Sequence, residues 1–364
     1  MIRLITMLTI TCALASPARA LETSLGELTV TEMAGELQAP WAFDFLPDGD
    51  VLITERGGRL WRLDDDGARM EVSGVGDVAA VGQGGLLDLL IPRDFDRTRE
   101  LIFTLAKRQG NGAGTAVAVA RLTEQGDRLK DWRIIWEMEP GSRGGRHFGS
   151  RVVETDDGLL FVTVGERGDR PAAQDLSREN GSVIRITREG QVPQGNPFVG
   201  QDGAQPEIWS YGHRNPQGAA IDAEGHLWVS EHGAKGGDEV NRVEKGANYG
   251  WPVISYGTHY SGREFPEGSS KEGMEQPSFY WDPSMAPSGH MIYAGEMFSE
   301  WKGHHFIGSL KFGHIARLAG DPLELREQIE GPKTGRVRAI EEAPDGSIWY
   351  LSVSDGALYR LSPQ

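Results

Sequence analysis

Residues 47–63 read PDGDVLITERGGRLWRL, and residues 344–361 repeat the pattern as PDGSIWYLSVSDGALYRL. Each stretch begins with an acid–glycine turn, continues as an alternating apolar strand, turns again and ends in a second strand that carries an arginine and a leucine. Asp-Gly and Gly-Gly supply the positive φ that tight turns need, and alternating Val, Leu, Ile and Trp suit a half-buried strand. Both stretches therefore predict β-hairpins.

The same pattern occurs four more times between these two stretches. Clear copies occupy Asp156–Gly168 and Ala223–Gly233, and weaker copies occupy Leu101–Leu122 and His304–Leu318. Six copies at an average spacing of about sixty residues fit six propeller blades with insertions in some loops. A sandwich or a solenoid also has many short strands, but the spacing is too long for a solenoid and a single sandwich of this size would be unusual. We predict an all-β, six-bladed β-propeller.

No linker or change in composition divides the chain, so we expect one domain over residues 21–364. The segment GELTVTEMAGEL (Gly26–Leu37) is expected to supply the strand that closes the ring with the last blade. A long loop, residues 252–287, is rich in Gly, Ser, Tyr and acidic residues. Long loops on a rigid scaffold commonly carry function, and we expect this loop to cover one face.

The first twenty residues have the features of an export signal. Arg3 gives a positive start, an apolar run follows over residues 4–15, and residues 18–20 (Ala-Arg-Ala) match the small-x-small pattern of a signal-peptidase site. The apolar run is too short to span a bilayer. We predict a signal peptide over residues 1–20 and a periplasmic or secreted protein. Cleavage also removes Cys12, the only cysteine, so the mature chain has no disulfide.

The charge of the chain excludes several classes of partner. The formal net charge is −16, and it becomes −18 when the two arginines of the signal peptide are removed. Nucleic acids and anionic membranes both bind basic surfaces, so neither is expected as a partner. The sequence has no second long apolar run and no HExxH helix, phosphate loop or GxSxG elbow. We therefore expect no membrane insertion and none of the common metalloprotease, kinase-like or α/β-hydrolase activities.

Polar residues that could perform chemistry lie in loops beside the predicted strands, where propellers place their axial sites. A histidine near a carboxylate can act as a general base that the acid orients. Cations that converge on one axis need an anionic ligand. Two acids after a glycine-rich run could bind a hard cation such as calcium together with backbone carbonyls. The candidates are Gln83, His147, Glu166, Arg214, Asn215, Asp238, Glu239, Lys311, Arg336 and Arg338.

The segments that carry these residues resemble the soluble sugar dehydrogenases that depend on pyrroloquinoline quinone (PQQ), the aldose sugar dehydrogenase or glucose/sorbosone dehydrogenase family. The resemblance runs from about Pro40 to Leu361, and the order and spacing of the motifs match the family. The strongest motifs are APWAFDFLPDG, VGQGGLLDL, RHFGSR, SYGHRNPQG, SEHG with GGDEVN, GANYGWP, SLK and RVRAIEEAPDG.

The resemblance implies a role for each candidate. His147 would be the general base that takes the proton of the anomeric hydroxyl, and Glu166 would orient it, in a position where the family often has aspartate. Arg214 would stabilise negative charge at the C5 oxygen of the quinone. Gln83 would contact cofactor and substrate. The groups that would hold the carboxylates and quinone oxygens of PQQ are Asn215, Lys311, Arg336 and Arg338.

The resemblance also implies calcium. The carbonyl oxygens of Gly233 and Ala234 would hold the ion beside the cofactor, and the family commonly has proline in place of Ala234. Calcium would polarise the C5 carbonyl as a Lewis acid. A second calcium near Asp238, Glu239 and Tyr249 is a further implication. An aromatic cover over the cofactor would come from Tyr280 or Trp281, although either ring could belong to the core.

The function that follows is oxidation of aldoses at the anomeric carbon to lactones, with hydride transfer to PQQ and electrons passed to an unidentified external acceptor. Two alternatives stay open: a calcium-dependent lactonase, which would need carboxylate and asparagine ligands on the axis, and a propeller that binds a ligand without catalysis. We expect a monomer that accepts a broad range of aldoses.

Overall fold

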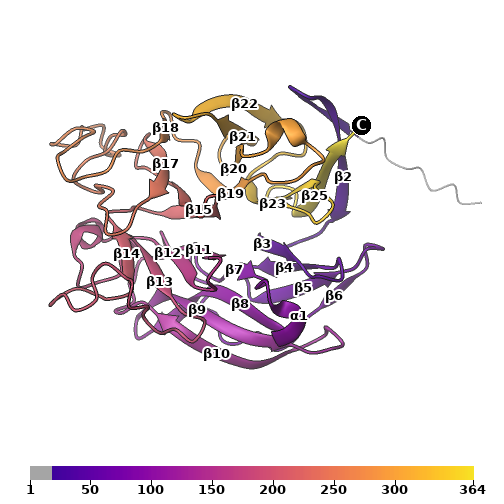
Figure 1. The fold of residues 1–364 in the computed structure, drawn as a ribbon, viewed down its shortest axis with the longest axis horizontal. Helices are drawn as coiled ribbons and strands as arrows, with labels where there is room; N and C mark the ends of the chain where they lie inside the picture. Colours follow the sequence, from indigo (N-terminus) through magenta and orange to yellow (C-terminus); the bar gives the residue numbers. More distant parts are fainter. Residues whose placement is uncertain (1–18) are drawn as a thin grey trace, which may run out of the picture.

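The computed structural model describes residues 19–364, and their strands form six antiparallel sheets arranged in a ring (Figure 1). The prediction of a six-bladed β-propeller is confirmed. Most of the predicted signal peptide, residues 1–18, lies outside the described residues. Within residues 19–364, no helix is long and apolar enough to cross a membrane. The helical segments are short: α1 (Phe95–Thr98), η1 (Arg170–Gln174) and η2 (Ser299–Trp301).

Each of the first three blades is a four-stranded meander that runs from the axis outward. The first contains β3 (Pro40–Phe45), β4 (Val51–Glu55), β5 (Arg59–Leu63) and β6 (Arg69–Glu71). The second contains β7 (Leu86–Leu90), β8 (Glu100–Gln109), β9 (Gly112–Leu122) and β10 (Leu129–Glu137). The third contains β11 (Gly149–Glu154), β12 (Leu160–Val164), β13 (Ser182–Ile186) and β14 (Ile208–Tyr211).

The remaining three blades complete the ring. The fourth contains β15 (Pro216–Ile221), β16 (Leu227–Glu231), β17 (Asp238–Val243) and β18 (Phe279–Trp281). The fifth contains β19 (Pro287–Ile292), β20 (His305–Ser309), β21 (His314–Ala319) and β22 (Glu324–Glu330). The sixth has five strands, which are β23 (Val337–Glu342), β24 (Ile348–Ser352), β25 (Ala357–Pro363), β2 (Gly26–Ala34) and β1 (Arg19–Thr23).

The ring closes where the beginning and the end of the chain share the sixth blade. β2 pairs with β25 in an antiparallel register that places Thr31 opposite Arg360 (Figure 1). The segment 26–37 was expected to supply this strand, and it does. Ser24 at the β1–β2 turn also contacts Glu327 on the outer strand of the fifth blade, its amide donating to a carboxylate oxygen at 2.6 Å. The closing strands therefore join the sixth blade to its neighbour.

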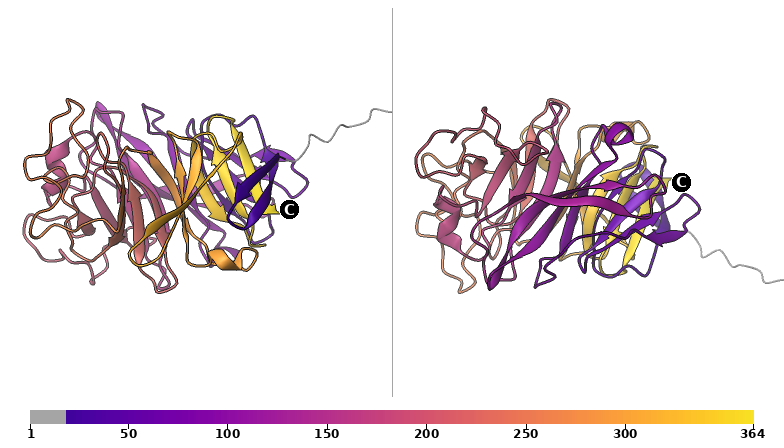
Figure 2. Two further views of the ribbon diagram at one scale, coloured as in Figure 1. Left: turned by 90° about the horizontal axis from the view of Figure 1, so that it is seen from above. Right: turned by 90° about the horizontal axis from the view of Figure 1, so that it is seen from below.

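The apolar core lies between the blades. In residues 19–364, six clusters of buried side chains fill the six spaces between neighbouring sheets. A fully buried Leu, Val or Phe side chain stabilises the fold by about 1.5–3 kcal/mol relative to an exposed one. Two views from the side show the strands standing across a flattened ring, with the longest loops gathered at one edge (Figure 2). The scaffold around the axis is therefore held on every side by packed sheets.

Hydroxyl groups add a polar connection between successive blades near the axis. A Thr or Ser on the second strand of one blade donates to a main-chain carbonyl on the inner strand of the next. These bonds join Thr54 to Leu87 (2.7 Å), Thr104 to Ser150 (2.7 Å), Thr163 to Pro216 (3.1 Å) and Ser230 to Ser288 (3.4 Å). Each inner strand also has a register shift near its first residues. Such bulges redirect side chains beside functional sites.

Two cavities lie on the axis, at opposite ends of the inner strands. The larger, of about 590 Å³, is bounded by the first residues of these strands, and the smaller, of about 390 Å³, by their last residues. The smaller cavity is acidic, and it contains Asp44 and Glu341. Burial raises the pKa of Asp44 to about 7. Burial, together with the nearby charge of Asp44, raises the pKa of Glu341 well above its ordinary value.

Replacing Glu341 with glutamine is expected to stabilise the protein at alkaline pH. A carboxyl whose pKa is higher in the folded state destabilises that state progressively as pH rises above the unfolded pKa. The melting temperature of Glu341→Gln should therefore match wild type near pH 4, about the unfolded pKa of glutamate, and exceed it above pH 8. Differential scanning calorimetry across this range measures the difference.

The matched control is Glu342→Gln, because the carboxylate of Glu342 lines the same cavity but accepts the amides of Ala294 (2.7 Å) and Gly295 (3.0 Å). This variant should lose stability. A difference between Glu341→Gln and wild type that does not grow with pH would contradict the prediction.

Candidate active site

The larger axial cavity has a strongly positive lining. Three of the candidate residues, Lys311, Arg336 and Arg338, border it, and Arg56 at the β4–β5 turn adds a fourth cation. Among the described residues that border this cavity there is no carboxylate. Three of the cations also bind main-chain carbonyls: Lys311 Nζ donates to Ser284 O at 3.1 Å, Arg336 donates to Leu310 O at 2.9 Å, and Arg56 donates to Gly82 O. An anionic ligand would therefore meet positive charge that no acid among residues 19–364 pairs with.

The lowered pKa of Arg338 shows that these cations lie close together. Burial, together with the positive charges of Arg151, Arg336 and Arg56, lowers the pKa of Arg338 to about 9. Its guanidinium donates to the side-chain oxygen of Gln217 at 2.6 Å. The Arg338 guanidinium also lies 5.6 Å from the ring of Trp41, which borders the cavity. Bound negative charge would relieve this repulsion.

The structure brings His147 and Glu166 into direct contact beside the cavity. Glu166 directly follows β12 and Gly165, and the carboxylate is almost completely buried, whereas the imidazole is 12% exposed. Nδ1 of His147 binds Oε1 of Glu166. A proton on Nδ1 is therefore held by the carboxylate, and Nε2 is left as the acceptor. Within residues 19–364, Nε2 has no hydrogen-bond partner.

The electrostatic environment keeps His147 unprotonated. Burial lowers its pKa below the ordinary value, Glu166 opposes this shift, and the positive charges of Arg214 and Arg146 add to it. The net direction is downward. The imidazole is therefore neutral at neutral pH, which is the form that accepts a proton.

Close main-chain packing fixes the loop that carries His147. His147 has a left-handed backbone (φ 55°), and its amide donates to the side-chain oxygen of Gln83 at 2.8 Å. A Cβ atom at Gly165 would lie only 2.0 Å from His147 O, so the strand can approach the loop only with glycine there. The buried guanidinium of Arg167 donates to Gly144 O at 2.8 Å and also binds Arg146 O. These contacts hold His147 in one position.

Arg214 approaches the axis from the loop before β15. Its side chain is 5% exposed, lies 5.2 Å from the ring of Trp251, and donates to His232 O at 3.3 Å and to the hydroxyl of Tyr260 at 3.4 Å. Its amide donates to Glu231 Oε2 at 2.7 Å. Burial lowers the pKa of the guanidinium. Tyr260 belongs to the long loop that was expected to cover one face, so this loop does reach the candidate site.

His232 shows that the candidate base and the candidate cations converge. It borders the large cavity, and its Nε2 binds Pro287 O at 2.7 Å. Burial lowers its pKa to about 3, and the charges of Arg214, Arg338 and His147 contribute to that shift. These three residues come from three different blades, yet all act on one imidazole. The structure therefore brings the predicted base and two of the predicted cations to one place.

Asn215 lies among these groups, and its side-chain oxygen accepts hydrogen bonds from neighbouring protein groups. Its side-chain oxygen accepts the amide of Gly149 at 3.2 Å and Nε2 of Gln217 at 3.3 Å, and both Asn215 and Gln217 border the cavity. The sequence had not assigned roles to Trp41, Arg56, Gln217 or His232. Trp41, Gln217 and His232 lie in quoted family-like motifs, which was the available signal. Arg56 lies in the hairpin 47–63, where a turn arginine has no distinguishing pattern.

The two acids of the GGDEVN motif have different surroundings, because neighbouring strand residues point to opposite faces. Asp238 accepts the amides of Gly233 (2.8 Å) and Ala286 (2.7 Å) and the hydroxyl of Ser284 (2.9 Å). Its oxygens are therefore occupied in shaping the loop. Glu239 lies opposite Glu231 in the β16–β17 register, and burial with the charge of Glu231 raises its pKa to about 8.

A very small cavity lies between Glu231, Glu239 and the glycine-rich loop that contains Gly233. It measures about 10 Å³, and Glu231, Glu239, Gly233 and Tyr249 are among the residues that border it. Two neighbouring carboxylates and nearby main-chain oxygens form the kind of ligand set that a hard cation prefers. Both oxygens of Glu231 already accept hydrogen bonds, from His213 and Asn241 and from the Arg214 amide. Glu239 is therefore the carboxylate here that fits a calcium ion.

The two candidate aromatic covers occupy different environments. Trp281 is buried and packs with Val240, Met285 and Ile307 between two blades. Tyr280 is 45% exposed and stacks on Tyr256 with ring centres 4.0 Å apart. Trp281 is therefore a core residue, and Tyr280 lies at the surface.

Comparison with known proteins gives a consistent picture. A family model described as Glucose / Sorbosone dehydrogenase matches residues 37–360. Aldose sugar dehydrogenase YliI of Escherichia coli is 41% identical over 347 residues, which cover 93% of each chain. Quinoprotein glucose dehydrogenase B of Acinetobacter calcoaceticus is 28% identical over 307 residues, which cover 76% of this chain and 62% of that protein. The apo crystal structure of the soluble E. coli aldose sugar dehydrogenase superposes with a TM-score of 0.90 and 39% identity, covering 93% of this chain and all of that one.

Proposed function

The chain belongs to the glucose/sorbosone dehydrogenase family, and from this premise we propose that it oxidises aldoses at the anomeric carbon to lactones, using PQQ and calcium. The observation that carries the proposal is the axial cavity with four cations and no carboxylate in its described lining, next to a neutral histidine held by a glutamate. A similar protein carries the name quinoprotein glucose dehydrogenase, which supports a quinone as the cofactor.

The cavity fits PQQ by charge. PQQ is a tricarboxylate, and Lys311, Arg336, Arg338 and Arg56 would hold its negative groups, with Gln83 and Asn215 at the edge of the cavity. The main-chain oxygens of Gly233 and Ala234 would hold the calcium beside it, and Glu239 with Tyr249 would hold a second ion. When bound, PQQ supplies the centre that accepts the hydride from the sugar, and calcium increases its electrophilicity.

The residues of this chain would perform the proton chemistry. Nε2 of His147 takes the proton of the anomeric hydroxyl, because Nδ1 already donates to Glu166. Glu166 stabilises the imidazolium that forms, as a buried carboxylate partner does. Arg214 offers positive charge where negative charge develops on the acceptor. The sugar thus loses one hydride and one proton and becomes a lactone, and the electrons then pass to an external acceptor.

The cavity disfavours the lactonase alternative. A calcium-dependent lactonase would need carboxylate ligands on the axis, whereas the described lining of the large cavity contains cations and no acid. The carboxylates of the axis lie in the other cavity, at the far ends of the inner strands. The proposed dehydrogenase accounts for the positive lining, and the lactonase does not.

Reconstitution tests the proposal. The purified protein is incubated with PQQ and calcium, and oxidation of a panel of aldoses is followed with a redox dye. We expect activity on several aldoses only when both PQQ and calcium are added, and loss of activity when calcium is chelated before PQQ is added. Activity without PQQ, or hydrolysis of lactones by the protein as isolated, would contradict the proposal.

A further inference from the structure

Arg151 on β11 and Asp88 on β7 form a buried ion pair on the axis. Nη1 of Arg151 lies 2.8 Å from Oδ1 of Asp88, and the two side chains are only 5% and 7% exposed. The other carboxylate oxygen of Asp88 accepts the amide of Val152 at 2.9 Å. Asp88 and Arg151 both border the smaller cavity, and their neighbours Leu87, Gly149 and Gln217 border the larger one. The pair therefore lies between the two cavities, directly beneath the floor of the candidate active site.

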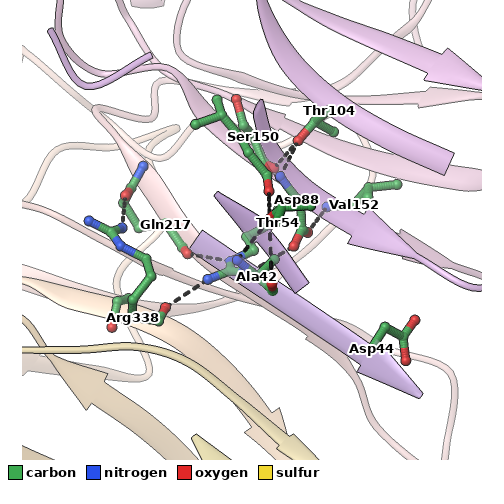
Figure 3. A network of polar contacts seen from close by, with 12 residues as sticks. Ala42, Asp44, Thr54, Asp88, Thr104, Ser150, Val152, Gln217 and Arg338 are labelled. Atoms are coloured by element: carbon green, nitrogen blue, oxygen red, sulfur yellow. Dashed lines mark hydrogen bonds and ion pairs between the residues drawn. The ribbon is translucent and has the colours of Figure 1, made fainter. Parts of the chain in front are cut away.

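The remaining donors of Arg151 hold two more inner strands. Nε donates to Gln217 O on β15 at 2.8 Å, and Nη2 donates to Arg338 O on β23 at 2.8 Å. The guanidinium also stacks 4.2 Å from the ring of Trp41 on β3. Together with Asp88, these contacts connect five of the six inner strands through one side chain. Figure 3 shows this network, with Gln217 and Arg338 on one side and Asp88 and Val152 on the other.

The strands that Arg151 holds are those that carry the floor of the large cavity. Gln217, Arg338 and Trp41 all border this cavity. The Arg338 guanidinium donates to the side-chain oxygen of Gln217, and the side-chain nitrogen of Gln217 donates to Gly149 O at 3.0 Å. Arg151 thus fixes the main chain of both partners in the bond that orients Arg338.

Only arginine can make all of these hydrogen bonds with one side chain. Its planar fork donates in several fixed directions, so one guanidinium reaches a carboxylate and two carbonyls that belong to three strands. Asp88 pairs with this guanidinium at 2.8 Å, so Arg151 has an acidic partner beneath the cations of the cavity. A lysine could keep the ion pair but could not keep both carbonyl contacts in this geometry.

We propose that Arg151 is a positioning residue for the anion-binding floor, which sets the affinity for the cofactor rather than the rate of proton transfer. It acts through Arg338 and Gln217, and it does not touch the reacting atoms. The inference rests on the proposed function, because it takes PQQ as the anion that the floor holds.

The test measures binding of PQQ as well as turnover. The dissociation constant is determined from quenching of tryptophan fluorescence when PQQ is added to the calcium-loaded protein. Arg151→Lys and Arg151→Met are compared with Arg317→Met, which removes a similarly buried pair, Arg317 with Glu327 at 2.9 Å, in the outer part of the fifth blade. Arg151→Lys keeps the charge opposite Asp88, and so guards against a failure of Arg151→Met to fold.

We expect the dissociation constant for PQQ to rise about 10- to 100-fold in both Arg151 variants, as when a supporting partner of a directly binding residue is lost. It should change less than about threefold in Arg317→Met, since a buried pair outside the site affects mainly stability. Turnover at saturating PQQ and its pH profile should stay within about threefold of wild type, because the His147–Glu166 pair is untouched.

Wild-type affinity in a folded Arg151→Lys variant would overturn the inference alone, as would a loss of turnover at saturating PQQ with unchanged affinity. Failure of the wild-type protein to bind PQQ would instead contradict the proposed function, so the two failures are distinguishable.

Discussion

Replacing His147 with glutamine is expected to lower kcat by about 10³- to 10⁴-fold, at the upper end of what a general base contributes. Glutamine has nearly the length of histidine and can still accept a hydrogen bond, but it cannot take up a proton at neutral pH. The His147 imidazole binds Glu166 and the His147 main-chain amide binds Gln83, and within residues 19–364 the imidazole makes no hydrogen bond to a cation of the cavity. The affinity for PQQ should therefore change little. Stopped-flow reduction of the loaded enzyme by an aldose measures the chemical step directly.

The pH dependence of the wild-type enzyme gives a second readout for His147. Because its pKa lies below the ordinary value, kcat/KM should rise with pH and reach half its maximum below about pH 6.5. This rising limb should disappear in His147→Gln. The matched control is His226→Gln, a half-buried histidine at a surface turn that binds Asp222 at 3.1 Å. Normal turnover in His147→Gln, or an unchanged pH profile, would exclude it as the base.

Replacing Arg214 with methionine is expected to lower kcat by about 10²- to 10³-fold, the usual cost of removing a group that stabilises developing negative charge. Methionine preserves much of the apolar packing on Trp251 but has no charge. The loss should appear in kcat rather than in KM for the sugar, because the charge develops only as hydride leaves the sugar. Steady-state kinetics with saturating PQQ separates the two parameters.

Arg170 offers a control with the same packing. Its guanidinium lies 5.1 Å from the ring of Trp251, and it binds Nδ1 of His259 at 2.9 Å rather than a residue of the axis. Arg170→Met should therefore change kcat by less than about threefold, because Arg170 makes no contact in the described part of the chain that would stabilise the transition state. An equal loss in Arg170→Met and Arg214→Met would show that Trp251 packing, and not the charge of Arg214, supports turnover.

The hairpin signals predicted the middle strands of the blades better than the outer strands. The stretches 47–63 and 344–361 contain β4–β5 and most of β24–β25 in the expected places. The outer strands β6 and β22 carry no such signal: β22 reads ELREQIE and is mostly exposed. Such strands form because the preceding strand offers an unpaired edge, and this depends on the blade rather than on local sequence.

The candidate site shows a similar division. His147 and Glu166 could be paired from sequence because they flank two successive strands, β11 and β12, which form a hairpin. The distinction between Tyr280 and Trp281 could not be made, because it depends on which face of β18 meets the next blade. Arg151 had no visible role, although it lies in the quoted motif RHFGSR. Its partners come from β7, β15 and β23, and only the closed ring brings them together.

The pairing of β2 with β25 determines the order in which the molecule can assemble. Hairpins within a blade join residues close in sequence and can form as the chain emerges. The β2–β25 pairing, which forms the seam of the ring, joins residues more than three hundred positions apart. The large cavity takes Trp41 from β3 and Arg338 from β23, which are neighbours only across that seam. The pocket is thus the last part of the molecule to be completed. An unfinished chain cannot capture a ligand there, and a ligand that bridges the seam stabilises the finished ring against opening.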